Sequence, residues 1–135
     1  MTNLTVLRPA SEQEIVELQS LLDKDTDNDV RGVRSGSDFL GETVFAITHG
    51  GKYAGFCTYR GAADEIFPLV VFKHYRRKKV GFSAMQQLIG LLKKNGISQV
   101  GIEVLPGAEF FWKSVFAGFP EQRHFCGKKF TYTIQ

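Results

Sequence analysis

The residues best suited to bind a charged ligand form one basic segment, Lys73 to Lys79, which holds five Lys or Arg side chains and one His. A helix is predicted directly after it, over residues 81 to 94, because apolar residues recur there at helical spacing. The N-terminus of a helix offers amide groups without helical partners and about half a positive charge. Gly81 would let the backbone approach a ligand without an intervening Cβ. The arrangement favours a phosphate or pyrophosphate ligand.

The basic charges alone leave two other interpretations open. Four consecutive cations, Arg76 to Lys79, attract any anion, including the backbone of a nucleic acid. A solvated charged face would have the same composition. The elements around the segment must therefore decide between these interpretations.

No other cluster of reactive residues predicts a metal site or a nucleophile. The histidines and cysteines are scattered, without the spacing of metal ligands, at His49, His74, His124, Cys57 and Cys126. The segment from Asp23 to Asp29 holds four Asp but lacks the pattern of a calcium loop. We interpret it as a solvated loop, or as a loop that favours a cationic acceptor.

Composition predicts one domain over residues 1–135. The chain has 43% apolar and 23% charged residues with a net charge of +3, as is typical of a globular protein. Its first residues lack the apolar core of a signal peptide, and no apolar run reaches the roughly 20 residues of a membrane span. Two free thiols suit a reducing compartment. We expect a cytoplasmic protein that does not bind membranes.

Hydrophobic periodicity and turn residues predict the elements that position the basic segment. Strands are expected at 4–7, 43–48, 53–59, 65–72, 97–104, 122–126 and 129–134, and helices at 11–23, 81–94 and 108–116. Ser11 and Glu14 form a capping-box pattern at the first helix. The fold class is α/β (α+β), and the middle strand–helix–strand unit should be a right-handed parallel crossover.

Pro68 lies within the strand expected at 65–72. Proline cannot donate a hydrogen bond to a neighbouring strand, so this position predicts an edge or a bulge.

The element order and the turn Arg76-Arg77-Lys78-Lys79-Val80-Gly81 resemble the GNAT superfamily of N-acetyltransferases, whose turn reads Arg or Gln, two residues, Gly, one residue, Gly or Ala. The resemblance implies one domain with a mixed sheet of six to seven strands, a splayed parallel pair and about four flanking helices. It also implies acetyl-CoA as co-substrate. Lys79 replaces the first glycine of the motif.

The resemblance also assigns residues to the two ends of the cofactor. Backbone groups of Leu69, Val70 and Val71 would pair with the pantetheine arm. Amides in the turn and the first helical residues, together with Arg76, would hold the pyrophosphate; these residues are Arg77, Lys78, Lys79, Val80, Gly81 and Phe82.

Glu65 lies eleven residues before Arg76. In the histone-acetyltransferase branch of the superfamily that the chain resembles, a glutamate at this spacing is the general base for the acceptor amine. A carboxylate on the floor of a cleft can have its pKa raised by burial. The alternative is a solvated glutamate beside Asp64.

Trp112 stands where the family often has the tyrosine that protonates the departing thiolate. An indole offers only an N–H donor and is no acid in water. We therefore expect Trp112 to pack in the core, and the acid to be absent or replaced by a group such as Tyr59 or Ser114.

The sequence supports three functional hypotheses. The first is acetyl transfer from acetyl-CoA to an amine on a small molecule or a protein, by direct attack. The second is a non-catalytic GNAT-like module that binds CoA or a protein partner. The third, binding of a nucleic acid, is disfavoured because Tyr75 is the only interleaved aromatic in the basic segment. A homodimer through the edge of the last hairpin is possible.

Overall fold

The computed structural model describes residues 4–25, 30–33, 41–123 and 128–135. Seven strands form one mixed sheet in the order β1-β2-β3-β4-β5-β7-β6. The strands are β1 (Thr5–Pro9), β2 (Glu42–His49), β3 (Lys52–Arg60), β4 (Glu65–Val71), β5 (Gln99–Glu103), β6 (Glu121–Arg123) and β7 (Lys129–Thr133). The helices are α1 (Glu12–Lys24), α2 (Val80–Lys94) and α3 (Glu109–Val115). The predicted α/β class and element order are confirmed.

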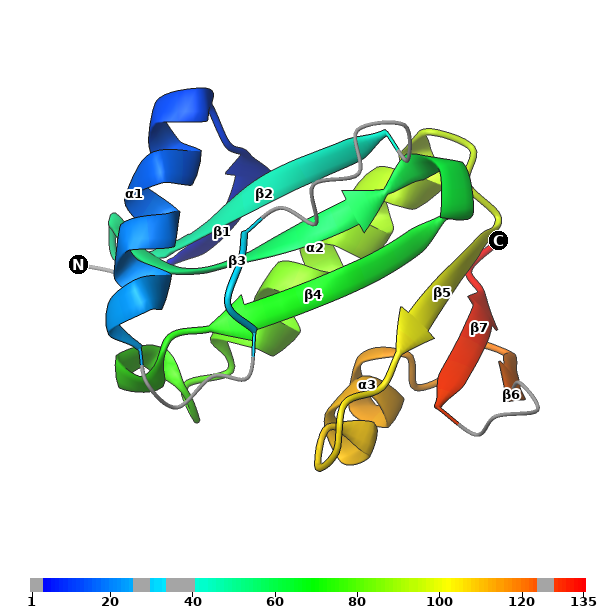
Figure 1. The fold of residues 1–135 in the computed structure, drawn as a ribbon. Helices are drawn as coiled ribbons and strands as arrows, with labels where there is room; N and C mark the ends of the chain where they lie inside the picture. The colour runs from blue at the N-terminus through cyan, green and yellow to red at the C-terminus, as the bar shows by residue number, and fades with distance from the viewer. Residues whose placement is uncertain (1–3, 26–29, 34–40, 124–127) are drawn as a thin grey trace.

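The helices lie on both faces of the sheet (Figure 1). On one face α1 packs through Leu18 and Leu22 against Phe56 and Val70. On the other face α2 and α3 share a larger aromatic and aliphatic core with the strands. None of the described helices is long and apolar enough to cross a membrane.

The resemblance implied about four flanking helices, and three α-helices lie in the described residues. The segment from Asp23 to Gly41 is polar and has no apolar periodicity. Residues 26–29 and 34–40 of that segment lie outside the described residues. Residues 30–33, which the structure describes between these two gaps, contain no helix.

The bulge predicted at Pro68 is confirmed. Cys57 pairs with Leu69 and Tyr59 pairs with Ile66, so β4 has one residue more than β3 between these two pairs. The extra residue changes which face each side chain meets. Ile66 packs with α2, whereas Val70 packs with α1.

β4 and β5 form the only parallel pair among the described strands, and their pairing is short. It joins Glu65 to Gly101 and Ile66 to Ile102, with no pair beyond. Past this point the two strands diverge (Figure 1). The splayed parallel pair that the resemblance implied is thus present.

Gly55 on β3 permits the sheet to form beside the bulge. A Cβ at this position would lie 2.1 Å from the carbonyl oxygen of Val70, a distance that no side chain can tolerate. A glycine inside a strand often marks such a close backbone approach.

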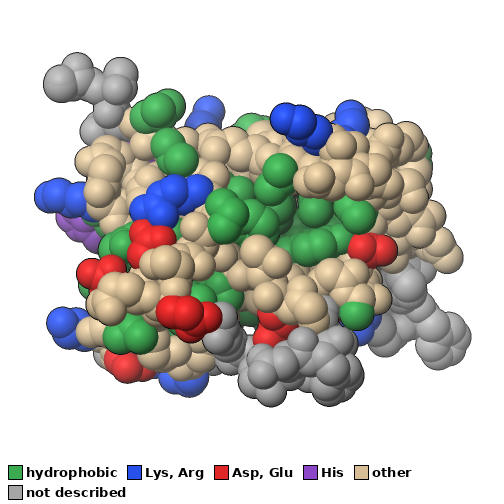
Figure 2. Space-filling view, turned by 90° about the horizontal axis from the view of Figure 1, so that it is seen from above, with side chains coloured by type: hydrophobic (Ala, Val, Ile, Leu, Met, Phe, Trp, Pro, Cys, Tyr) green, Lys and Arg blue, Asp and Glu red, His purple; other side chains and the backbone are tan. Residues whose placement is uncertain are grey.

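The outer edge of β1 is occupied by a side chain of α2. The amide of Leu7 donates to Gln87 Oε1 (2.9 Å), and Gln87 Nε2 donates to the carbonyl of Thr5 (2.8 Å). These bonds block an edge that could otherwise pair with another chain. Figure 2 shows the molecule from above the view of Figure 1. This face carries apolar side chains in a hollow near its middle.

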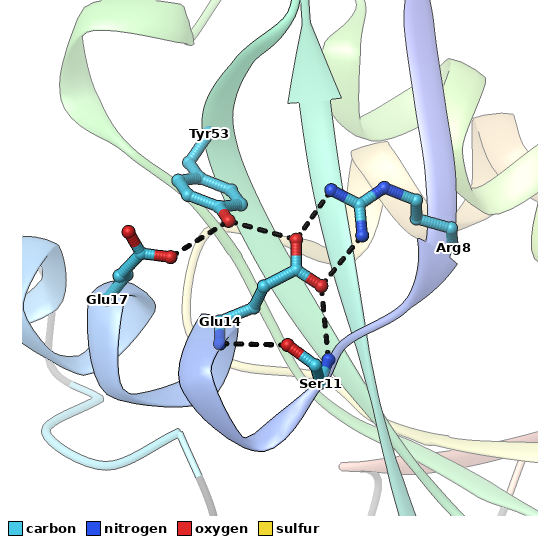
Figure 3. A network of polar contacts seen from close by, with 5 residues as sticks. All are labelled: Arg8, Ser11, Glu14, Glu17 and Tyr53. Atoms are coloured by element: carbon cyan, nitrogen blue, oxygen red, sulfur yellow. Dashed lines mark hydrogen bonds and ion pairs between the residues drawn. The ribbon is translucent and has the colours of Figure 1, made fainter.

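The first turn of α1 carries the predicted capping box and a wider polar network (Figure 3). The amide of Glu14 donates to Ser11 Oγ (3.2 Å), and the amide of Ser11 donates to Glu14 Oε1 (3.1 Å). Arg8 of β1 donates to the same Glu14 carboxylate (2.7 Å), as does the Tyr53 hydroxyl of β3 (2.9 Å). The network therefore ties the helix to two strands.

This network predicts how stability depends on pH. The hydrogen bond from Arg8, followed by those from Ser11 and Tyr53, lowers the pKa of Glu14 from 4.5 to about 2. A lowered pKa gives stability that is complete above pH 4.5 and is lost as pH falls through 2. In urea melts, Glu14→Gln should be less stable than wild type at pH 6, and the difference should shrink towards zero as pH falls to 2.

Ser11→Ala provides the control. It removes a hydroxyl cap, which does not titrate, so it should cost about 1 kcal/mol across the same pH range. A Glu14→Gln difference that stayed constant with pH would contradict the ion-pair explanation.

Candidate functional site

A cleft opens where β4 and β5 part. A cavity of about 110 Å³ lies at this point, between the two strands and α3. Its lining residues are Ile66, Phe67, Leu69, Glu103, Leu105, Ala108, Phe111 and Trp112. The walls are largely apolar, so the cavity suits an acyl or alkyl chain better than a charged group.

The basic turn connects the open end of this cleft to α2. Arg77 and Lys79 have positive φ angles, 64° and 61°, on either side of Lys78. Such alternation turns successive backbone N–H groups towards one side, as in other anion-binding turns. Lys79 is the N-cap of α2 and makes no side-chain cap hydrogen bond. The first amides of α2 thus keep their capacity to bind an anion.

Lys79 explains how the turn forms without the first glycine of the motif. A glycine at that position would adopt the left-handed conformation without strain. Lys79 adopts the same conformation with φ 61°, at a cost of roughly 1–2 kcal/mol for a residue with a Cβ. The backbone shape is therefore kept, and a cation is added beside it.

The four cationic side chains of the turn divide into two groups. Arg77, Lys78 and Lys79 are exposed. Arg76 instead points back to the protein, where its Nε donates to the carbonyl of Val71 (2.9 Å) and its Nη2 lies 3.7 Å from Asp25 Oδ2. Sequence reasoning treated all four alike, whereas the structure gives Arg76 a structural contact.

Gly81 is buried at the start of α2. A Cβ there would lie 3.3 Å from the ring of Phe111 and 3.3 Å from Val71 Cγ2. The glycine therefore gives space to two side chains of the cleft wall, in addition to any room it leaves for a ligand.

The three residues expected to pair with a pantetheine arm do not all face the cleft. The carbonyl of Val70 lies against Gly55 of β3, and the amide of Phe72 donates to Ala54 of β3 (2.8 Å). Because backbone groups alternate along a strand, those of Leu69 and Val71 point to the side where β5 diverges. Leu69 also lines the cavity.

Glu65 lies at the start of β4, at the closed end of the cleft. Its side chain is 13% exposed, so it is not the solvated glutamate of the alternative interpretation. Oε1 lies 3.2 Å from Arg60 Nη1, and Oε2 lies 3.6 Å from Lys129 Nζ. Two cations therefore contact the carboxylate, which the sequence did not indicate.

A second hollow surrounds this carboxylate on the face of the sheet opposite α2. It measures about 360 Å³, and Glu65, Gly101, Lys129 and Thr131 contribute to its walls. Gly101 pairs with Glu65 of β4 and with Thr131 of β7, and it places no side chain between these two residues. The hollow gives an approach to Glu65 from the side away from the apolar cavity.

Glu103 is a candidate residue of the functional site that was not predicted from the sequence. It lines the cavity and lies opposite Lys129 in the register of β5 and β7. Its place at the carboxyl end of a strand in a parallel pair was a usable signal, because ligands of α/β sheets bind at such ends.

The three side chains considered for protonating the thiolate, those of Trp112, Tyr59 and Ser114, lie in three different environments. Trp112 is buried and stacks with Phe116, as expected of a core residue. The hydroxyl of Tyr59 donates to Asp64 Oδ1 (2.7 Å), and burial raises its pKa. Tyr59 is thus committed to a structural bond. Ser114 is exposed on α3.

The described residues contain no group of three or more His, Cys, Asp or Glu that could hold a metal. Cys57 is buried, and burial raises the pKa of its thiol, so it is no ready nucleophile. His124 and Cys126 lie outside the described residues.

Comparison with known proteins places these features in context. The sequence profile of the Acetyltransferase (GNAT) family matches residues 13–113. No curated protein sequence matches the chain.

Solved structures share the fold at low sequence identity. A GNAT-family acetyltransferase from Staphylococcus aureus Mu50 superposes with a TM-score of 0.70 at 12% identity, covering 98% of this chain and 100% of that one. The ribosomal-protein-S18-alanine N-acetyltransferase from Escherichia coli gives 0.66 at 18%, covering 96% and 90%. The PaiA N-acetyltransferase from Thermoplasma acidophilum, solved with coenzyme A, gives 0.68 at 14%, covering 96% and 98%.

The left-handed conformation of Lys79 leads to a test of the turn. Lys79→Gly should raise the free energy of unfolding by about 1 kcal/mol, because relief of the backbone strain exceeds the added freedom of the unfolded chain. The matched control is Lys78→Gly, since Lys78 lacks a positive φ; it should lower stability. Thermal melts of both variants measure the effect, and equal shifts would contradict the strain at Lys79.

Proposed function

Since the chain belongs to the GNAT acetyltransferase family, we propose that it transfers an acetyl group from acetyl-CoA to an amine by direct attack. The observation that carries the proposal is the parting of β4 and β5 next to an uncapped helix N-terminus. The parting of the two strands suits a thioester with its alkyl arm, and the helix N-terminus suits a pyrophosphate. Both lie on the same short stretch of chain.

The cavity and the turn fit the two chemical ends of acetyl-CoA. The pyrophosphate would bind the amides that begin α2, with Arg77, Lys78 and Lys79 supplying positive charge. The pantetheine arm would run along the diverging edge of β4, where Leu69 and Val71 present backbone groups. The acetyl group would then reach the narrow end of the cleft, beside the apolar cavity. The coenzyme A bound to the PaiA N-acetyltransferase, a structural neighbour, is consistent with this ligand.

In the proposed reaction the acceptor nitrogen attacks the thioester carbon, the C–S bond breaks, and CoA leaves as the thiolate. A backbone amide on the diverging edge of β4 near Val71, such as that of Leu69, would stabilise the oxyanion as a preorganised donor. Glu65 would take the proton of the amine, directly or through a water molecule. The acceptor would enter through the hollow on the opposite face.

Lys129 bears on how an acceptor reaches Glu65. Its side chain is 50% exposed and contacts Glu65 Oε2 at 3.6 Å. A cationic acceptor amine would replace this exposed ammonium at the carboxylate. Arg60, at 19% exposure, would stay and keep Glu65 in place.

The proposed activity is tested by measuring release of free CoA thiol from acetyl-CoA in the presence of a panel of amines. Primary amines should increase the release above the rate of spontaneous hydrolysis, and mass spectrometry should detect the acetylated amine. Isothermal titration of CoA measures binding separately. Binding of CoA without transfer to any amine, peptides included, would instead support a non-catalytic module.

The role of Glu65 is tested by Glu65→Gln, which should lower kcat about 100-fold while leaving the Kd for CoA nearly unchanged. Glu42→Gln is the matched control, since Glu42 is also a buried carboxylate beside Arg60, at 3.8 Å. It should disturb Arg60 with little effect on kcat. Equal losses in the two variants would point to Arg60 and remove Glu65 from the mechanism.

A further inference from the structure

Asp25 lies just past the end of α1, beside the basic turn. Its side chain is only 7% exposed. Oδ2 accepts a hydrogen bond from the amide of Lys73 (3.1 Å) and lies 3.7 Å from Arg76 Nη2. One buried carboxylate thus contacts both ends of the segment Lys73 to Arg76, which is 48 residues away in sequence.

These contacts form part of a closed chain of hydrogen bonds. Arg76 Nε donates to the carbonyl of Val71 (2.9 Å), the last residue of β4. Between these ends, a 3-10 turn from Lys73 to Tyr75 is closed by the bond from Tyr75 N to Phe72 O (2.8 Å). The path of the backbone from β4 to Arg76 is therefore fixed at three points.

The backbone of Asp25 is itself anchored. Its amide donates to the carbonyl of Leu22 (3.0 Å), and its carbonyl accepts from Arg31 Nη2 (3.0 Å). Leu22 is fully buried in the core under α1. The carboxylate is thus mounted on a packed helix.

The residues that follow Arg76 are the ones that present amides to an anion. Arg77 and Lys79 hold unfavourable positive φ angles, and such angles persist only where the surroundings determine them. Fixing Arg76 fixes the point from which this strained stretch begins. A loose start would let the amides of Arg77 to Gly81 turn away from one another.

We propose that Asp25 is a positioning residue for pyrophosphate binding: it acts through Lys73 and Arg76 and does not touch the ligand. The inference rests on the proposed function, because it concerns the same CoA site. It assigns to α1 a role in cofactor affinity. It also gives Arg76 a structural role, in which its charge is balanced by Asp25.

The sign of the effect distinguishes this role from simple electrostatics. A carboxylate near a phosphate site repels the ligand, so removing its charge should tighten binding if charge alone mattered. If Asp25 holds the turn, removing it should weaken binding. The two explanations predict opposite changes in Kd.

The test compares the Kd for CoA, measured by isothermal titration, in wild type and in variants shown to be folded by their thermal melts. Asp25→Ala should weaken CoA binding about tenfold. Asp25→Asn, which keeps an oxygen acceptor for Lys73, should weaken it about threefold and remains informative if the alanine variant does not fold. Asp23→Asn is the matched control, because Asp23 accepts from Gln19 on the same helix (2.8 Å); its Kd should equal that of wild type.

Two further readouts separate positioning from a general loss of structure. In the acetyl-transfer assay, Asp25→Asn should raise KM for acetyl-CoA and leave kcat with acetyl-CoA unchanged. For S-acetylpantetheine, which lacks the pyrophosphate, the same variant should leave kcat/KM unchanged. Arg76→Met should weaken CoA binding to a similar extent. The double variant, Asp25→Asn with Arg76→Met, should bind CoA no more weakly than the weaker-binding of the two single variants.

Unchanged or tighter binding of CoA by Asp25→Asn and Asp25→Ala, with wild type binding normally, would overturn the role of Asp25 and leave the proposed function intact. Equal losses with CoA and S-acetylpantetheine would also overturn it. If wild type itself does not bind CoA, both proposals fail together.

Discussion

The parting of β4 and β5 after two residue pairs is the constraint on which the rest of the molecule depends. Backbone groups of a strand that loses its neighbour need other partners, because an unsatisfied buried amide or carbonyl is costly. Arg76 provides one such partner by donating to the carbonyl of Val71. Leu69 and the amide of Val71 also face the diverging side. The part of the site beside the cavity is therefore built from an interruption of the sheet.

The bulge at Pro68 makes this interruption compatible with a single packed core. Before the bulge, Ile66 packs against α2, and after it Val70 packs against α1. The extra residue shifts the alternation of side chains along β4, so that Ile66 and Leu69, on either side of the bulge, both pack in the layer of α2. Gly55 completes the arrangement, since the carbonyl of Val70 occupies the space that a side chain at Gly55 would need.

Local features of this fold could be predicted from sequence, because their causes lie within a few residues. The capping box of Ser11 and Glu14 and the bulge at Pro68 are of this kind, and both are present. The resemblance of the turn at Arg76 to Gly81 correctly indicated the family.

The contacts of charged side chains could not be predicted in this way. Asp25 meets Lys73 across 48 residues, and Glu65 of β4 meets Lys129 of β7, which lies two strands away in the sheet. Such pairs depend on which strands and helix ends become neighbours, and periodicity carries no information about that. For the same reason the four cations of the turn looked equivalent, although Arg76 points inward and Arg77 to Lys79 are exposed.

The two departures from the family pattern have different physical weight. Lys79 keeps the backbone shape of the glycine that it replaces, because its φ of 61° lies in the left-handed region. The function of that glycine is conformational, so a strained lysine can perform it and add a charge. Trp112 replaces a residue whose function is chemical, and burial against Phe116 adds no acidity to an indole. A thiolate leaving group needs little help, since a thiol of ordinary pKa near 8.5 is a far better leaving group than an amine. The loss of the tyrosine is therefore compatible with transfer in a way that loss of the turn would not be.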